Sequence, residues 1–235
     1  MTINHDIDIA IYRGRTPELK AADIRVVIDV IRAFTTTHIA LKRGACSIWL
    51  AESLDDARRL AADGSGRLLA GERNALAPSG FDLGNSPAQM AGADVAGREV
   101  VLTTTNGVQA TLHAAFDGPL IVTGFSNAGA TLCHLRRLVA GGRRRIELIA
   151  SHPSGDEDLA CARWLSARLR GRKRPRDQEV QRRIRRSRAA EKFLDTDRPR
   201  YRAADIEFCA RRDDSRWPMV ASFRGPELVV EARAH

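Results

Sequence analysis

The sequence has few aromatic residues and few cysteines. Phe, Trp and Tyr make up 5% of the 235 residues while 43% are hydrophobic, so the core must consist mainly of Ala, Val, Leu and Ile. The four cysteines lie far apart and form no Cys-x-x-Cys pair. That spacing argues against a zinc site and against a small disulfide framework. We therefore expect reduced, mostly buried thiols, as is usual for a cytoplasmic enzyme.

Long apolar runs are also missing. No stretch approaches the ~20 apolar residues that a membrane-spanning helix needs. The segment 1–10 lacks the basic start and apolar stretch of a secretory signal peptide. From the sequence we expect a cytoplasmic protein with no membrane partner.

Several familiar hydrolase motifs are absent. There is no Cys-x₅-Arg loop, no Arg-His-Gly and no Gly-x₄-Gly-Lys loop, so nucleotide hydrolysis is not expected. Asp6 and Asp8 have the Asp-x-Asp spacing, but no strong hydrophobic strand precedes them and we interpret the match as chance. His152 is the one histidine at a candidate strand end, and we interpret it as a loop residue.

Positive charge is concentrated in one segment. Residues 168–202 hold 15 Lys and Arg against 5 Asp and Glu, a net +10 in a chain whose total is +9. The basic character therefore belongs to this segment and not to the chain as a whole. Its centre, residues 178–192, predicts a basic helix, which we interpret mainly as a solvated face. Steering of an anionic substrate is a further interpretation.

Short apolar runs alternate with helical stretches along most of the chain. This rhythm predicts an α/β fold, layered αβα, with a mixed, largely parallel sheet. Two further strands with no helix between them, at 205–210 and 227–231, predict an antiparallel part. We expect residues 1–235 to form one α/β region and leave open a division into two subdomains. The other predicted strands are 24–30, 48–51, 67–71, 99–103, 120–123 and 146–150, and the helices are 35–43, 53–63, 107–116, 128–140 and 156–170.

Polar residues follow five of the predicted strands. In open α/β sheets, ligands bind outside the carboxyl ends of the strands, so these residues are candidates for one site. They are Asp29, Arg32 and Thr35–Thr37; Glu72 and Arg73; Thr103–Thr105 and Asn106; Ser126 and Asn127; and 151–155 with Glu157 and Asp158.

This mixture of side chains suits a phosphorylated ligand held with a metal ion. Hydroxyls and N–H groups at helix starts bind phosphate oxygens, and arginine binds such anions bidentately. Carboxylates would repel the anion unless a hard cation such as Mg²⁺ lay between them. Each group alone has a structural interpretation as well: the threonines as helix caps, Glu72 and Arg73 as a surface ion pair, and Glu157 and Asp158 as acids at a helix start.

Four blocks of sequence resemble the 2-phosphosulfolactate phosphatase family. The strings at 80–87 and 102–107 are specific, because neither is a generic glycine-rich loop. The blocks are 27–37 (VIDVIRAFTTT), 71–73 (GER) with 80–87 (GFDLGNSP), 102–107 (LTTTNG) and a weaker match at 157–162 (EDLACA).

The resemblance implies Mg²⁺-dependent release of phosphate from 2-phospho-3-sulfolactate, a step toward coenzyme M. Our hypothesis makes Asp29, Arg32 and Glu72 catalytic, with either Asp29 or a metal-polarised water as nucleophile. The metal ligands would be Asp29, Glu72, Asp82, Glu157 and Asp158. Substrate would be bound by Thr36, Thr37, Arg73, Thr104, Thr105, Asn106, Ser126 and Asn127.

The sequence departs from the family pattern in places. Arg163 stands where we expect glycine, and residues 170–200 are richer in arginine than expected. The alternative hypothesis is therefore a nucleic-acid-binding protein that uses residues 168–202 on a catalytically degenerate α/β domain. We favour a small anionic phosphorylated substrate as the partner and leave a homo-oligomer open.

Overall fold

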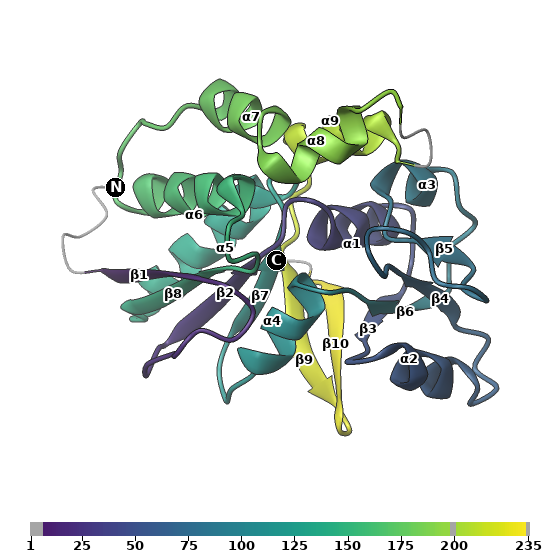
Figure 1. The fold of residues 1–235 in the computed structure, drawn as a ribbon. Coiled ribbons are helices and arrows are strands. Elements are labelled where there is room, and N and C mark those ends of the chain that lie inside the picture. The colour runs from purple at the N-terminus through teal and green to yellow at the C-terminus, as the bar shows by residue number, and fades with distance from the viewer. Residues whose placement is uncertain (1–6, 198–200, 234–235) are drawn as a thin grey trace.

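The computed structural model describes residues 7–197 and 201–233, and a ten-stranded sheet runs through this part of the chain (Figure 1). Residues 1–6, which include Asp6 and the start of the N-terminal segment considered above, lie outside it, as do 198–200 of the basic segment. The strand order is β1 (Asp8–Arg13), β8 (Arg145–Ala150), β2 (Ile24–Ile28), β7 (Leu120–Thr123), β9 (Met219–Arg224), β10 (Glu227–Ala232), β3 (Ser47–Leu50), β6 (Glu99–Thr103), β4 (Leu68–Gly71) and β5 (Leu83–Gly84).

The sheet consists of two parallel halves joined by an antiparallel hairpin. Strands β1, β8, β2 and β7 are parallel to one another, and so are β3, β6, β4 and β5. The hairpin β9–β10 lies between the halves and pairs antiparallel with β7 on one side and β3 on the other. The predicted mixed, largely parallel sheet with an antiparallel part is therefore confirmed.

Helices cover both faces of the sheet, as the predicted αβα layering requires. Val26 and Ile28 of β2 pack against α5 and α6, whereas Val27 between them packs on the opposite face with α1 and α4. This explains why the strand is apolar at successive positions. The helices are α1 (Ala33–Lys42), α2 (Leu54–Ala61), α3 (Pro87–Ala91), α4 (Gly107–His113), α5 (Ala128–Ala140), α6 (Asp156–Leu169), α7 (Asp177–Arg185), α8 (Arg188–Leu194) and α9 (Ala203–Ala210).

The carboxyl ends of the two parallel halves meet near the middle of the molecule. Three antiparallel pairings separate β7 from β3, so the halves run in opposite directions and their carboxyl ends would lie at opposite edges of a flat sheet. The sheet instead curls, and the end of β6 reaches the end of β2. A Cβ atom on Gly107 would lie 2.7 Å from Oδ2 of Asp29, so only glycine fits this close approach.

Two sequence predictions in the second half of the chain are wrong. The predicted strand at 205–210 belongs to helix α9, whose buried residues Asp205, Ile206, Cys209 and Ala210 have helical spacing. The predicted basic helix at 178–192 is two helices, α7 and α8. They separate at Ser187, whose hydroxyl accepts a hydrogen bond from the N–H of Ala190 and caps α8.

Four short elements were not predicted: β1, β5, α3 and β9. Within the described ranges, no helix is both long enough and apolar enough to cross a membrane.

Candidate active site

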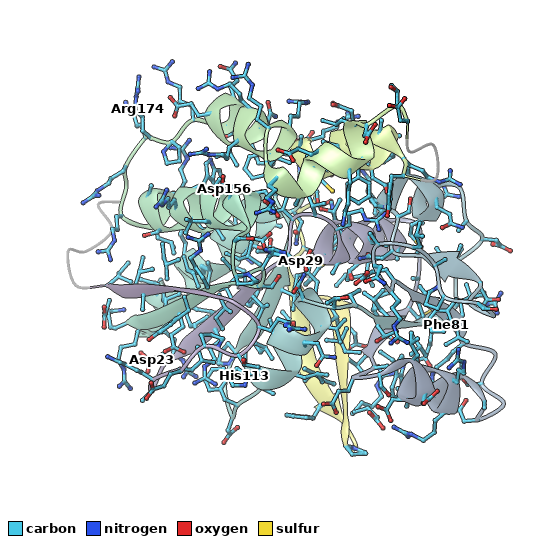
Figure 2. All side chains as sticks on the ribbon, in the orientation of Figure 1. Asp23, Asp29, Phe81, His113, Asp156 and Arg174 are labelled. Atoms are coloured by element: carbon cyan, nitrogen blue, oxygen red, sulfur yellow. The ribbon has the colours of Figure 1, made fainter. Side chains whose placement is uncertain are left out.

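A cavity of about 600 Å³ lies between the opposed strand ends. Figure 2 labels Asp29 near the middle of the molecule, where the two halves of the sheet meet. Five groups of residues line the cavity. They are Asp29, Ile31 and Arg32 after β2; Glu72, Asn74, Ala75 and Asn85 around β4 and β5; Thr104–Asn106 after β6; His152, Ser154 and Gly155 after β8; and Arg188, Ala189, Lys192 and Phe193 of α8.

Asp29 is held at the base of α1. Its Oδ1 accepts a hydrogen bond from the N–H of Ala33 at 2.9 Å, and its Oδ2 accepts one from the Ser151 hydroxyl at 3.1 Å. Burial raises the pKa of Asp29 to about 6, and the nearby charge of Glu72 adds to that rise. Asp29 is therefore a fixed carboxylate whose charge is costly in the free protein and would be favoured by a bound cation.

Two further acids lie close to Asp29 at the start of α6, and their environments differ. Asp158 accepts hydrogen bonds from the N–H of Val30 at 2.7 Å and of His152 at 3.2 Å, so it ties the ends of β2 and β8 together. Burial raises the pKa of Asp158, and the charges of Glu157 and Asp29 raise it further. Burial also raises the pKa of Glu157, to about 7, and its buried Oε2 has no hydrogen-bond partner.

Glu72 faces Asp29 from the other half of the sheet. Its two carboxylate oxygens accept hydrogen bonds from the N–H groups of Ala75 and Thr105, each at 2.7 Å. The hydroxyl of Thr104 accepts one from the N–H of Val108 in α4. Both residues line the cavity together with Thr105 and Asn106, so four predicted site residues from different strand ends share one wall.

Arg32 lines the cavity but is already engaged by the protein. One guanidinium nitrogen donates to Asp205 at 2.7 Å, and another donates to the carbonyl of Ala75 at 2.7 Å. The guanidinium also lies over the ring of Phe193, 4.5 Å from its centroid. Asp205, which also accepts from the hydroxyl of Ser86, is fully buried, so Arg32 fastens three segments together besides facing the cavity.

Helix α8 brings two cations of the basic segment to the cavity. Arg188 and Lys192 both line it. Burial lowers the pKa of Lys192 and the charge of Arg32 lowers it further, while Glu72 opposes the change. Arg188 and Lys192 were not among the predicted site residues, although their spacing of four positions in a helix places them on one face.

Several predicted site residues lie elsewhere. Asp82 is exposed, does not line the cavity, and accepts a hydrogen bond from the N–H of Leu69. Arg73 is also exposed and outside the cavity. Thr36 and Thr37 are buried within α1, where their hydroxyls have no hydrogen-bond partner.

Ser126 and Asn127 lie outside the cavity as well and have local partners. Ser126 is hydrogen-bonded to Nδ1 of His38 at 3.0 Å, and His38 in turn to Ser215. The side-chain oxygen of Asn127 accepts from the hydroxyl of Thr123 and the N–H of Gly124. Both therefore fit structural roles at the end of β7.

The acidic residues in and beside the cavity determine whether it can hold a divalent ion. In the part of the chain that the structure describes, no three Asp, Glu, His or Cys side chains are grouped so as to hold an ion alone. Mg²⁺, however, is commonly bound by one or two carboxylates together with waters and phosphate oxygens. Asp29 and Glu72 offer such oxygens in the cavity, whereas Glu157 and Asp158 are buried and do not line it. The unpartnered Oε2 of Glu157 and the raised pKa values of Asp29 and Glu157 are signs of uncompensated negative charge beside it. The residues fit a hard cation shared with a ligand.

The fold and the cavity define an α/β enzyme with a site for a small anionic ester. The family model described as 2-phosphosulpholactate phosphatase matches residues 11–221. The chain belongs to this family, and it is an enzyme that hydrolyses a phosphate monoester.

Proteins with the same printed description show the similarity directly. A probable 2-phosphosulfolactate phosphatase of Bacillus subtilis is 43% identical over 203 residues, 86% of this chain and 89% of that protein. One from Synechocystis is 38% identical over 161 residues, 66% of this chain and 65% of its own length. One from Thermus thermophilus is 48% identical over 93 residues, 40% of this chain and 38% of its own length.

Proposed function

We propose that this chain is a Mg²⁺-dependent phosphatase that converts 2-phospho-3-sulfolactate to 3-sulfolactate and phosphate. Family membership supports the reaction class, and the names of the relatives support the substrate. The observation that carries the proposal is the cavity itself. It joins the carboxylates Asp29 and Glu72 to the cations of α8 in one space, as a substrate with two acidic ends and a shared metal ion requires.

In this proposal, each wall of the cavity has a distinct task. Asp29, Glu72 and Glu157 would hold the Mg²⁺, which when bound neutralises charge on the phosphate and polarises its ester. Thr104, Thr105 and Asn106 lie beside Glu72 and would hold the phosphate oxygens through hydroxyl, amide and backbone N–H groups. These groups fix the phosphorus in place for in-line attack.

Two routes for the attack remain in the proposal. In one, the Asp29 carboxylate attacks phosphorus, the P–O bond to C2 breaks, and the leaving oxygen takes up a proton to give 3-sulfolactate; water then hydrolyses the aspartyl phosphate to free Asp29 and phosphate. In the other, a water attacks directly, and Asp29 orients it or accepts its proton. Asp29 suits either role, because Ala33 and Ser151 fix its orientation while burial keeps its pKa near that of a general base.

Release of inorganic phosphate from synthetic 2-phospho-3-sulfolactate tests the proposal. We expect the purified protein to release phosphate, to stop when EDTA removes the metal, and to recover when Mg²⁺ is restored in excess. A monoester of an uncharged alcohol serves as the substrate control and should react poorly. Absence of release from the two-acid substrate at any Mg²⁺ concentration would overturn the substrate assignment, and release unaffected by EDTA would overturn the metal requirement.

The same reaction would place the enzyme in a cytoplasmic route toward coenzyme M, as the resemblance implies. The nucleic-acid-binding alternative is not favoured, because the family match covers the α/β region and part of the basic segment lines the cavity.

A further inference from the structure

The face of α8 that borders the cavity carries two positive charges. Arg188 and Lys192 are four positions apart and lie on the same side of the helix. Ala189, which also lines the cavity, is small and leaves space beside these two long side chains. The helix thus presents a pair of cations to whatever occupies the cavity.

Helix α8 is fixed in place by several contacts. The hydroxyl of Ser187 caps its first turn, and Ala190 and Phe193 pack with Ile206 of α9. The ring of Phe193 also lies beneath the guanidinium of Arg32. Two cations on an anchored helix can select a ligand geometry, because little freedom is lost when the ligand binds.

The protein leaves these two cations without a carboxylate partner. Arg32, in contrast, is neutralised by the buried Asp205 at 2.7 Å. Among the residues that the structure describes, no carboxylate lies within ion-pairing distance of Arg188 or Lys192, whereas Arg183 and Arg185 of the preceding helix α7 each have one. Lys192 lies over the rings of Phe193 and Tyr201, which do not neutralise its charge. Positive charge that borders a cavity and has no ion-pair partner favours an anionic ligand there.

The carboxylates and the cations occupy different walls. Asp29 and Glu72 come from the strand ends, whereas Arg188 and Lys192 come from the helical segment that covers them. An acidic group with no metal ion of its own would be repelled by the carboxylates and attracted by the cations. The transferred phosphate, by contrast, belongs with the metal ligands.

We propose that Arg188 and Lys192 bind an acidic group of the substrate other than the transferred phosphate, so that α8 selects phosphate monoesters that also carry a sulfonate or a carboxylate. This inference rests on the proposed function and deepens it. It gives part of the basic segment a role in substrate recognition. Sulfonate and carboxylate share the chemistry that the cations recognise, and both occur in the proposed substrate.

Binding of two separate probes in the presence of Mg²⁺ tests the inference. The probes are 3-sulfolactate, which lacks phosphate, and inorganic phosphate, which lacks the sulfonate and the carboxylate. The variants are Arg188→Met and Lys192→Met, with Arg182→Met as the matched control from an exposed position outside this cavity. Each cavity variant should weaken 3-sulfolactate binding by about tenfold or more, as expected for loss of a charged hydrogen bond, and phosphate binding by less than about threefold.

Arg182→Met should leave both affinities close to wild type. An equal loss for both probes would mean that α8 binds the phosphate, and an unchanged affinity for 3-sulfolactate would mean that it binds neither group. Either result overturns the inference.

Turnover separates this inference from the proposed function. In the cavity variants, KM for the two-acid ester should rise more than kcat falls, because the lost contact binds substrate in its ground state. If wild type releases phosphate and KM is unchanged in both variants, the function stands and the inference fails. If wild type binds 3-sulfolactate through α8 but releases no phosphate, the inference stands and the proposed function fails.

Discussion

The two walls of the cavity differ in how the chain holds their charges. On the strand-end wall, backbone N–H groups hold Asp29 and Glu72, and the nearby Glu157 keeps an oxygen without a partner. On the helical wall, Arg188 and Lys192 project from an anchored helix with no carboxylate partner in the described structure. Under our two proposals, the reaction takes place at the first wall and the second wall selects the substrate.

The largest predicted effect on activity is the difference between variants of Asp29 and of Asp82. Both Asp29 and Asp82 were predicted metal ligands, but only Asp29 lines the cavity. We expect Asp29→Asn to lower kcat at least about a hundredfold, because it removes a catalytic carboxylate. Asp82→Asn should stay close to wild type. Initial rates of phosphate release at saturating Mg²⁺ measure both, and equal losses in the two variants would contradict the assignment of the reaction to the strand-end wall.

The next prediction concerns Glu157 and Asp158, the two neighbouring acids at the start of α6, for which we expect different roles. Asp158→Asn should lower the free energy of unfolding by about 1–3 kcal/mol, because one of two buried N–H groups loses its acceptor. Glu157→Gln should instead raise the Mg²⁺ concentration needed for half-maximal activity, with little loss of stability. Urea unfolding and Mg²⁺ titration of activity measure the two effects. If Asp158→Asn raised the required Mg²⁺ concentration and Glu157→Gln lowered the free energy of unfolding, Asp158 and not Glu157 would be the metal ligand.

A smaller effect should appear in the pH dependence of stability without metal. The pKa of Asp29 is about 6 in the folded protein and 3.8 ordinarily, so between these values the folded state binds more protons than the unfolded state. The free energy of unfolding therefore falls as pH rises through this range, and it stays lower above it. Glu157, with a pKa of about 7 against an ordinary 4.5, acts in the same direction.

His38 has the opposite effect on the free energy of unfolding, because burial lowers its pKa to about 4. The pH dependence of the wild-type protein is therefore the sum of opposing contributions. The difference between Asp29→Asn and wild type removes the shared contribution of His38. Relative to wild type, this variant should become more stable as pH rises from 4.5 to 8 in EDTA. Thermal unfolding at a series of pH values measures this trend, and a difference independent of pH would contradict the raised pKa.

The smallest effect concerns the outer face of the basic segment. Arg182 and Arg186 line a separate groove between α6 and α7 and are exposed. Replacing either with Gln should lower kcat/KM by less than about threefold at low salt, with no effect at high salt, as expected for weak steering. A loss that persists at high salt would mean that the outer face also binds substrate directly.

The residues of the cavity that were predicted from the sequence stand directly after apolar strands. Asp29, Glu72 and Thr104 are examples, and strand ends are where ligands bind in α/β folds. The same rule misplaced Ser126 and Asn127, because β7 is the strand next to the hairpin and its end lies outside the cavity. The hairpin that joins the two halves includes β9, which was not predicted.

The helical wall could not be predicted because it depends on tertiary packing. The apolar residues of 205–210 were compatible with a strand, and no local pattern indicates that Asp205 pairs with Arg32, which is distant along the chain. The break at Ser187 decides which arginines turn toward the cavity. A Ser followed three residues later by Ala is too weak a helix-start signal to reveal that break.

A crystal structure with Mn²⁺ and a phosphate analogue tests the central claim most directly. Anomalous scattering locates the ion independently of any activity. The account predicts one ion in the cavity, bound by Asp29 with Glu72 or Glu157 and by an oxygen of the analogue, with the analogue's other end toward α8. An ion bound at Asp82, or an analogue seated away from Asp29, would contradict it.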